Sequence, residues 1–519
     1  MERTLHLVDY LIVIITLVGS IGMGIYFARR QESTNHYFAA GGTIPAWAVG
    51  ISILATLISS VTFLAYPGEG FSSNWIRLVQ GLMVPVVLLF MVKFVVPLYR
   101  NNIGLSAYEY FEKRFGFFAR FYASFAFILA HFSKMGTVFF LIALALSSMM
   151  GVNTYVVIYI LGISVVILTM LGGIEAVIWL DVIQGMMLMI GGLICLMILL
   201  FIPEGGPVAV LQYAWANNKM GLGPFDLDFT KLTFIVMALN GVFYAIQKYG
   251  TDQTIIQRYL TSRTDKEAIK AALLGVFLSV PVWALFMFIG TALYAYYNMT
   301  VAALPAGIRA DAIFPYFIVN ELPIGLAGLI VATLLAAAIS SLDSDMNCLA
   351  AIGVEDYYKR IRPDSTDAEQ LRMGKILVVV SGIAAIFVAT LYVQAGSKGV
   401  LGVVFALYAI FSGGIAGLFI LGLVSRRANK QGLYIGIAAS VLFTGYALLT
   451  STPMAFFGEK RLLIDLGDYN FTHHKYMLGV YSHLVLFSVA WIASHFFESE
   501  TPADNLTIYG WLENRKQAA

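Results

Sequence analysis

The amino-acid sequence predicts an all-α membrane protein that crosses the bilayer many times, and two observations support this. Of the 519 residues, 59% are hydrophobic and only 12% are charged, whereas a soluble domain has about 25% charged residues. The chain also contains thirteen apolar stretches near the length of about 20 residues that crosses a bilayer as a helix. The composition excludes a cytosolic enzyme or a secreted globule. A net charge of +2 gives no sign of nucleic-acid binding.

The apolar stretches are too long and too evenly apolar to be the strands of a barrel. The predicted spans are 7–27, 46–66, 75–99, 121–149, 154–171, 176–202, 232–250, 271–297, 324–350, 376–394, 400–424, 432–450 and 477–496. An odd number of spans puts the two termini on opposite sides of the membrane. The loops on the side of the C-terminus hold 20 of the 32 Lys and Arg residues, and those on the other side hold 8. The positive-inside rule therefore predicts an outside N-terminus and a cytoplasmic C-terminus.

Oxygen-bearing side chains gather in two of these spans. In 324–350, Ala337, Ser340, Ser341 and Ser344 follow the i, i+3, i+4, i+7 spacing of one helix face. Asp343 adjoins this face, and five hydroxyl side chains lie between residues 52 and 62 of the second span. Hydroxyl, carbonyl and carboxylate oxygens are ligands for a hard cation. The alternative is that the small residues only pack helices together.

Ionisable residues inside spans are costly and need a physical reason. The most notable of them are Arg77, Lys93, His131, Lys134, Asp181, Lys248, Asp343 and Asp345. Lys134 lies midway along its span, so it either pairs with a carboxylate of the protein or binds an anion. The sequence GxxxxGK[ST], which would cradle the phosphates of ATP, does not occur, so nothing supports ATP-driven transport.

Several strings of residues together resemble the sodium/solute symporter family, which includes sodium/glucose, proline, monocarboxylate and sialic-acid transporters. The resemblance covers nearly the whole chain and is greatest to the bacterial sodium-coupled sialic-acid transporters. The strings are Ala55-Thr56, Ile58 to Phe63, Ser106 to Tyr110, Gly172 to Gln184, Gln257-Arg258-Tyr259 and Ala336 to Ser344.

This resemblance implies a LeuT-type fold within a single transporter domain, 1–519. An extra N-terminal helix at 7–27 would precede two inverted repeats of five helices each, 46–202 and 232–424. Two C-terminal helices at 432–496 would follow. The first helix of each repeat is expected to be unwound near the middle of the membrane, where its free carbonyl groups can bind a cation.

The resemblance also implies the site residues. The common sodium site would use the carbonyls of Ala55, Ile58 and Ala337 and the hydroxyls of Ser340 and Ser341. A second sodium site would use Asp181, Ser340, Asp343 and Ser344. Relatives with that site carry Ser or Thr at position 343, so Asp343 would bind either sodium or a proton. The substrate would contact Ser59, Thr62, Arg77, Gln80, Lys134 and Tyr249.

Two of these positions depart from the sialic-acid transporters. Those proteins carry an arginine where Lys134 stands, to hold the substrate carboxylate, and lysine keeps the charge but loses the bidentate fork. They carry an aromatic residue where this chain has Arg77.

The predicted function is sodium-driven import of a small organic solute, such as an acidic sugar like sialic acid or another carboxylate. A neutral sugar or polyol is the alternative, and a membrane sensor without transport is a distant one. We expect no enzymatic activity and no cofactor, only Na⁺ as the coupling ion. The expected partners are the solute, Na⁺ and the lipid of the cell's inner (plasma) membrane, and a monomer would suffice.

Overall fold

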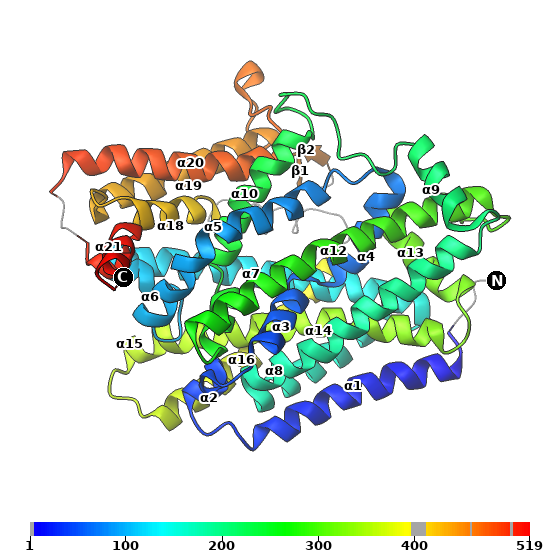
Figure 1. Ribbon diagram of the computed structural model, residues 1–519, viewed down its shortest axis with the longest axis horizontal. Helices are drawn as coiled ribbons and strands as arrows, with labels where there is room; N and C mark the ends of the chain where they lie inside the picture. Colours follow the sequence, from blue (N-terminus) through cyan, green and yellow to red (C-terminus); the bar gives the residue numbers. More distant parts are fainter. Residues whose placement is uncertain (1–4, 396–411, 457–458, 499–501, 519) are drawn as a thin grey trace.

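The structure is a computed structural model that describes residues 5–395, 412–456, 459–498 and 502–518, and it is built almost entirely of α-helices (Figure 1). The long helices are α1 (Leu7–Ala28), α5 (Leu78–Asn102), α7 (Phe117–Met150), α8 (Thr154–Phe201), α12 (Asp265–Met299), α14 (Leu326–Ile352), α16 (Asp367–Ala395), α19 (Lys430–Ser451) and α20 (Lys475–Ala493). The shorter ones include α2 (Thr34–Ala39), α3 (Ala46–Leu57), α4 (Ser60–Ser72), α6 (Glu109–Phe115), α9 (Gly206–Ala216), α10 (Phe234–Gly250), α11 (Gln253–Thr261), α13 (Ala310–Glu321), α15 (Lys359–Ile361), α18 (Ile415–Val424) and α21 (Ile508–Ala518). A short antiparallel hairpin joins β1 (Met454–Phe456) to β2 (Glu459–Arg461).

The helices agree with the predicted multi-pass membrane protein. Among the described residues, nine helices are long and apolar enough to cross a bilayer, and the bent pair α3 and α4 brings the number to ten. The 48 residues of α8 would extend for about 72 Å, more than twice the thickness of a hydrocarbon core. The predicted span 400–424 lies partly outside the described residues, and α18 covers its C-terminal part. The number thirteen stays a prediction.

Gly173 divides α8 between the two predicted spans 154–171 and 176–202. Its backbone has φ +58° and ψ −164°, so the helical conformation is interrupted there. A Cβ atom at this position would lie 2.8 Å from the carbonyl oxygen of Tyr37 in α2. Both the positive φ and the close backbone contact require glycine.

The second predicted span is broken in its middle, as expected. Helices α3 and α4 meet at an angle of 58°, with Ile58 and Ser59 extended between them. The amide of Ile58 donates to the carbonyls of Leu54 and Ala55, which closes the last turn of α3. The hydroxyl of Ser59 accepts a hydrogen bond from the amide of Val61 and caps α4. The hydroxyl-rich sequence therefore supplies the cap of α4, and a backbone amide closes α3.

A second break follows α10, which corresponds to the predicted span 232–250. Thr251 and Asp252 separate α10 from α11, and the side chain of Asp252 caps α11 by accepting from the amide of Thr254 at 2.9 Å. Residues 253–261, which hydropathy assigns to a cytoplasmic loop, instead form a helix whose members are almost all buried.

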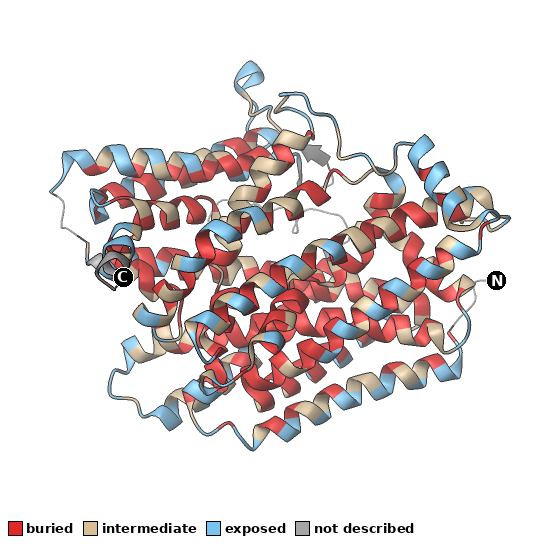
Figure 2. Cartoon of the chain, viewed as in Figure 1, coloured by how far each residue is buried: buried red, intermediate tan, exposed pale blue. Residues whose placement is uncertain are grey.

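Helix α14 is the centre of the molecule. Every residue from Ile330 to Ile352 is buried (Figure 2), and α8, α1, α7 and α16 pack around it. In Figure 1, α1 lies along one flank of the bundle, and α19 and α20 form the opposite flank. One carboxylate oxygen of Asp9, in α1, accepts hydrogen bonds from the amides of Gly325 and Gly328 at 2.7 and 2.8 Å. This carboxylate caps the N-terminus of α14.

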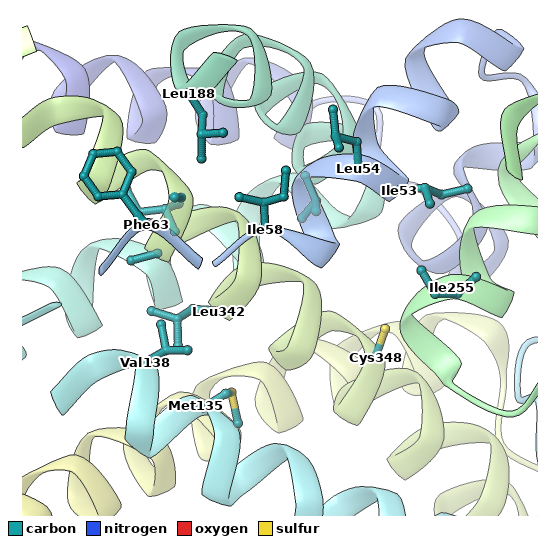
Figure 3. Packing of buried hydrophobic residues seen from close by; sticks show 14 of the residues in the cluster. Ile53, Leu54, Ile58, Phe63, Met135, Val138, Leu188, Ile255, Leu342 and Cys348 are labelled. Atoms are coloured by element: carbon teal, nitrogen blue, oxygen red, sulfur yellow. The ribbon is translucent and has the colours of Figure 1, made fainter. Parts of the chain in front are cut away.

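Apolar side chains pack tightly around the break between α3 and α4. Figure 3 shows Ile58 and Phe63, on either side of it, in one buried cluster with Leu188 of α8 and Leu342 of α14. On the far side of the break, α4 touches the backbone of α12. A Cβ atom at Gly290 would overlap the carbonyl oxygen of Pro67.

Candidate functional site

The break between α3 and α4 faces the serine-rich part of α14. The hydroxyl of Ser340 lies 3.3 Å from the carbonyl oxygen of Ala55 and 3.3 Å from that of Ala337. The hydroxyl of Ser341 is buried and has no hydrogen-bond partner among the described residues. Ile58 ends α3 in an extended conformation. The structure therefore brings together the oxygen atoms of Ala55, Ala337 and Ser340, with Ser341 next to them, in a neutral cluster that suits a hard monovalent cation.

Asp181 lies close to this cluster but already has a cationic partner. Nη2 of Arg258, in α11, donates to Oδ2 of Asp181 at 2.8 Å, and both side chains are fully buried. The same guanidinium donates to the hydroxyl of Ser344 at 2.8 Å and to that of Ser52 at 2.7 Å. The hydroxyl of Ser52 in turn donates to Asp181 at 2.5 Å. Arg258 therefore joins α11 to α3, α8 and α14.

Asp343 is the second buried carboxylate beside this guanidinium. Its Oδ1 lies 3.4 Å from the hydroxyl of Ser344. Its Oδ2, like Oδ1 of Asp181, is buried without a hydrogen-bond partner among the described residues. Arg258 thus pairs directly with Asp181 alone, and one oxygen of each carboxylate is free to accept a further proton or cation.

A cavity of about 410 Å³ begins at the break and extends between α7 and α10. Thr56, Leu57 and Ser59 line it at the break. Tyr108 and Asp252 line it at a distance from the break, in segments that the charge pattern predicts to be cytoplasmic. Lys134 is the cationic residue of α7 that reaches the cavity, and 32% of its side chain is exposed.

Five ionisable side chains lie together beside this cavity, and we call them the charge cluster: His131, Lys134, Lys248 and Asp252, which line it, and the buried Asp345. Nζ of Lys134 lies 3.0 Å from Oδ1 of Asp345, which is fully buried in α14. Nζ of Lys248 lies 2.7 Å from Oδ2 of Asp252. Lys134 therefore has a carboxylate partner inside the protein, while its partly exposed side chain lines the cavity.

The other predicted substrate residues lie apart from this cavity. On the opposite side of the break, Arg77 forms an ion pair with Glu69 of α4 at 3.1 Å and donates to the hydroxyl of Tyr476 of α20 at 3.1 Å. Gln80 accepts from Asn240 at 3.2 Å. Thr62 and Tyr249 are buried outside the cavity wall. Of the six predicted substrate residues, therefore, only Ser59 and Lys134 line the cavity.

Arg258 and Asp252 have no role in the sequence-based site, although the structure places both at its centre. Their segment, 251–270, is polar enough to be assigned to a loop. The one signal that the sequence offers is the string Gln257-Arg258-Tyr259, because it is among those that resemble the symporter family. Hydropathy alone does not reveal that this segment forms a short buried helix, α11, with Arg258 in the protein core.

Known proteins are similar to this chain in sequence and in architecture. The sequence model of the sodium:solute symporter family matches residues 37–439. The sodium/sialic acid symporter NanT of Aliivibrio fischeri is 33% identical over 450 residues, which cover 86% of this chain and 89% of that protein. The sodium/sialic acid symporter SiaT of Proteus mirabilis is 32% identical over 437 residues, 84% of this chain and 88% of that protein.

Solved structures agree with these sequence matches. A Na⁺-coupled sialic acid symporter in a substrate-bound outward-open state superposes with a TM-score of 0.86 and 29% identity, over 96% of this chain and all of that one. Mhp1, a nucleobase-cation-symport-1 family transporter, has the same general fold, with a TM-score of 0.57 and 17% identity over 90% of this chain and 97% of that one. The chain, a multi-pass membrane protein, therefore belongs to the sodium:solute symporter family.

Proposed function

We propose that this protein is a sodium-coupled symporter that carries a small organic acid, such as sialic acid, into the cell across the inner membrane. The observation that carries the proposal is the position of Lys134, whose ammonium group opens into the cavity that starts at the break between α3 and α4. Two relatives of similar length are named as sodium/sialic acid symporters, which supports an acidic sugar.

Sodium would bind at the neutral oxygen cluster formed by Ala55, Ile58, Ala337, Ser340 and Ser341. The unpartnered hydroxyl of Ser341 and the two long contacts of Ser340, both 3.3 Å, support this assignment. Because the cluster joins α3 to α14, bound sodium would hold the break in one conformation. Substrate affinity would then rise with sodium, and sodium affinity with substrate.

A second cation at Asp181, Ser340, Asp343 and Ser344 would compete with Arg258. The guanidinium already supplies one positive charge to Asp181 and Ser344. Asp343 has no cationic partner among the described residues, so we propose that either a sodium ion or a proton balances its charge at the free oxygens of Asp181 and Asp343.

Two five-helix repeats, 46–202 and 232–424, would rock against each other to expose the site to either side. The cavity extends toward segments that carry the excess of Lys and Arg, so this conformation would open to the cytoplasm. On the other side, the ion pair of Arg77 with Glu69 and its hydrogen bond to Tyr476 would close the outer route. Arg77 and Gln80 would meet the substrate only in an outward-open conformation.

A neutral sugar or polyol is the second candidate, and one observation favours it. Lys134 already has a carboxylate partner in Asp345, so the pair could present a neutral, hydrogen-bonding surface to an uncharged solute.

Uptake into proteoliposomes distinguishes these candidates. We expect an inward sodium gradient to drive uptake of labelled sialic acid, and a matched potassium gradient to drive none. The carboxamide of sialic acid is the matched neutral solute. Uptake of the amide or of glucose in preference to the acid would favour the second candidate. Sodium-dependent binding without uptake would indicate a sensor.

A further inference from the structure

His131 lies between the two ion pairs of the charge cluster, and neither the sodium site nor the substrate site accounts for it. Its Nε2 is 3.6 Å from Oδ1 of Asp345 and 3.8 Å from Oδ2 of Asp252. Asp345 comes from α14, Asp252 from the link between α10 and α11, and His131 itself from α7. The imidazole ring therefore faces carboxylates from two other elements of the fold.

The other ring nitrogen fixes the tautomer. Nδ1 of His131 is 3.0 Å from the carbonyl oxygen of Phe127, and a carbonyl can only accept a hydrogen bond, so Nδ1 carries the hydrogen. In a neutral ring, Nε2 then has a bare lone pair directed at two carboxylates. A proton on Nε2 turns both contacts from repulsive to attractive. Oδ2 of Asp345, which is buried without a hydrogen-bond partner among the described residues, adds a further free acceptor.

The charges of the cluster balance without this proton. Two ammonium groups, of Lys134 and Lys248, face two carboxylates, of Asp252 and Asp345, and the sum is zero when His131 is neutral. A substrate carboxylate at Lys134 would add one negative charge. An unbalanced charge in a site of low dielectric constant costs several kcal/mol.

The other polar groups near the charge cluster do not supply a positive charge to balance the substrate carboxylate. Tyr108, which precedes α6, lines the same cavity, and Cys348 of α14 donates to Gln257, but both are uncharged. Arg258 is held by Asp181. Ser340, in the proposed sodium site, precedes Asp345 by five residues, or about 7.5 Å along α14, whereas Nε2 of His131 lies 3.6 Å from Asp345.

We infer that binding of an anionic substrate at Lys134 is accompanied by uptake of one proton on Nε2 of His131, which makes the proton a further coupling ion. The proton comes from solution through the cavity, gives an imidazolium between the two carboxylates, and returns to solution when the anion leaves. The inference rests on the proposed function, because it requires a negatively charged substrate.

Isothermal titration calorimetry on the full-length protein in detergent tests this inference. Sialic acid is titrated at saturating sodium and about pH 7.5, where a histidine can be neutral, in two buffers with different enthalpies of ionisation. The difference in the binding enthalpies gives the number of protons taken up. We expect a value near one for the unaltered protein and near zero for the neutral carboxamide.

Variants locate the proton. H131Q should bind sialic acid with no proton uptake and with an affinity that no longer depends on pH. D345N removes one negative charge, so the cluster can balance the anion by itself, and proton uptake should fall to near zero. H483Q is the matched control, because His483 is also a buried histidine but lies in α20 beside Phe243. This control should keep the uptake of the unaltered protein.

The outcomes separate this inference from the proposed function. Sodium-dependent binding of sialic acid with no dependence on buffer would overturn the proton alone. Unchanged proton uptake in H131Q would overturn the assignment to His131. Failure of sialic acid to bind in a sodium-dependent way would overturn the proposed function and the proton with it. If H131Q does not fold, the comparison of acid, amide and D345N still decides.

Discussion

Replacing Lys134 by alanine separates its two roles only if Asp345 is changed as well. The single variant K134A removes the ammonium group from the cavity and also leaves a fully buried carboxylate without its partner at 3.0 Å. The double variant K134A/D345N removes the same ammonium group but replaces the carboxylate by a neutral amide. The difference in stability between the two variants therefore measures the contribution of the ion pair to folding. The loss of substrate affinity that both variants show measures the contribution of Lys134 to substrate binding.

The magnitudes follow from burial. Breaking a buried ion pair costs about 3–5 kcal/mol. We expect the lower end, about 3 kcal/mol, because 32% of the lysine side chain is exposed. The double variant should recover most of this loss of stability. A charge-assisted hydrogen bond to the substrate contributes about 1.5–3 kcal/mol, so both variants should raise the dissociation constant of sialic acid by about 10-fold to 150-fold.

Thermal unfolding in detergent measures the first effect, and equilibrium binding of sialic acid at saturating sodium measures the second. K134R should retain both stability and binding, because it keeps the charge. If the double variant binds sialic acid as well as the unaltered protein does, Lys134 is only the partner of Asp345, and the anionic substrate must bind elsewhere.

Three further changes test other parts of the argument. S340A/S341A should weaken sodium binding by at least about 10-fold, since two ligands to a cation are lost, and unchanged sodium dependence of substrate binding would exclude this site. R258Q leaves the buried carboxylate of Asp181 without its guanidinium, so sodium should protect this variant against thermal unfolding more than it protects the unaltered protein; equal protection would show that no cation can replace Arg258. G290A should destabilise the protein by about 1–3 kcal/mol, because its Cβ meets the backbone of α4, whereas the control G22A, in open space on α1, should unfold at or slightly above the temperature of the unaltered protein.

Local patterns in the sequence predicted much of the fold and the position of the serines in the neutral oxygen cluster. A helix face is set by spacing, so the serines of α14 could be placed on one side before any tertiary information was available. The break after Leu57 lies in the hydroxyl-rich stretch, where Ser59 caps α4, and Gly173 interrupts α8 in the gap between two predicted spans. These features depend on residues that are close in the chain.

The partners of the buried charges could not be predicted, because they come from distant segments. Asp345 was recognised as an unusual buried carboxylate, but its pairing with Lys134 spans 211 residues. Arg258 lies in a segment whose average polarity resembles a loop, although α11 is buried. Arg77 and Gln80 are likewise held away from the cavity by contacts with Glu69, Tyr476 and Asn240 that the sequence does not reveal.

The cap that Asp9 places on α14 has a consequence for how the chain is assembled during synthesis. The carboxylate and the amide of Gly325 are 316 residues apart, so α1 leaves the ribosome long before its partner exists. Until α14 is inserted, Asp9 must be solvated at the membrane surface or shielded by another protein. An N-terminal truncation that removes α1 leaves both proposed repeats intact but exposes the amides at the start of α14. We expect this truncation to lower the yield of folded protein more than it changes the sodium or substrate affinity of the molecules that fold.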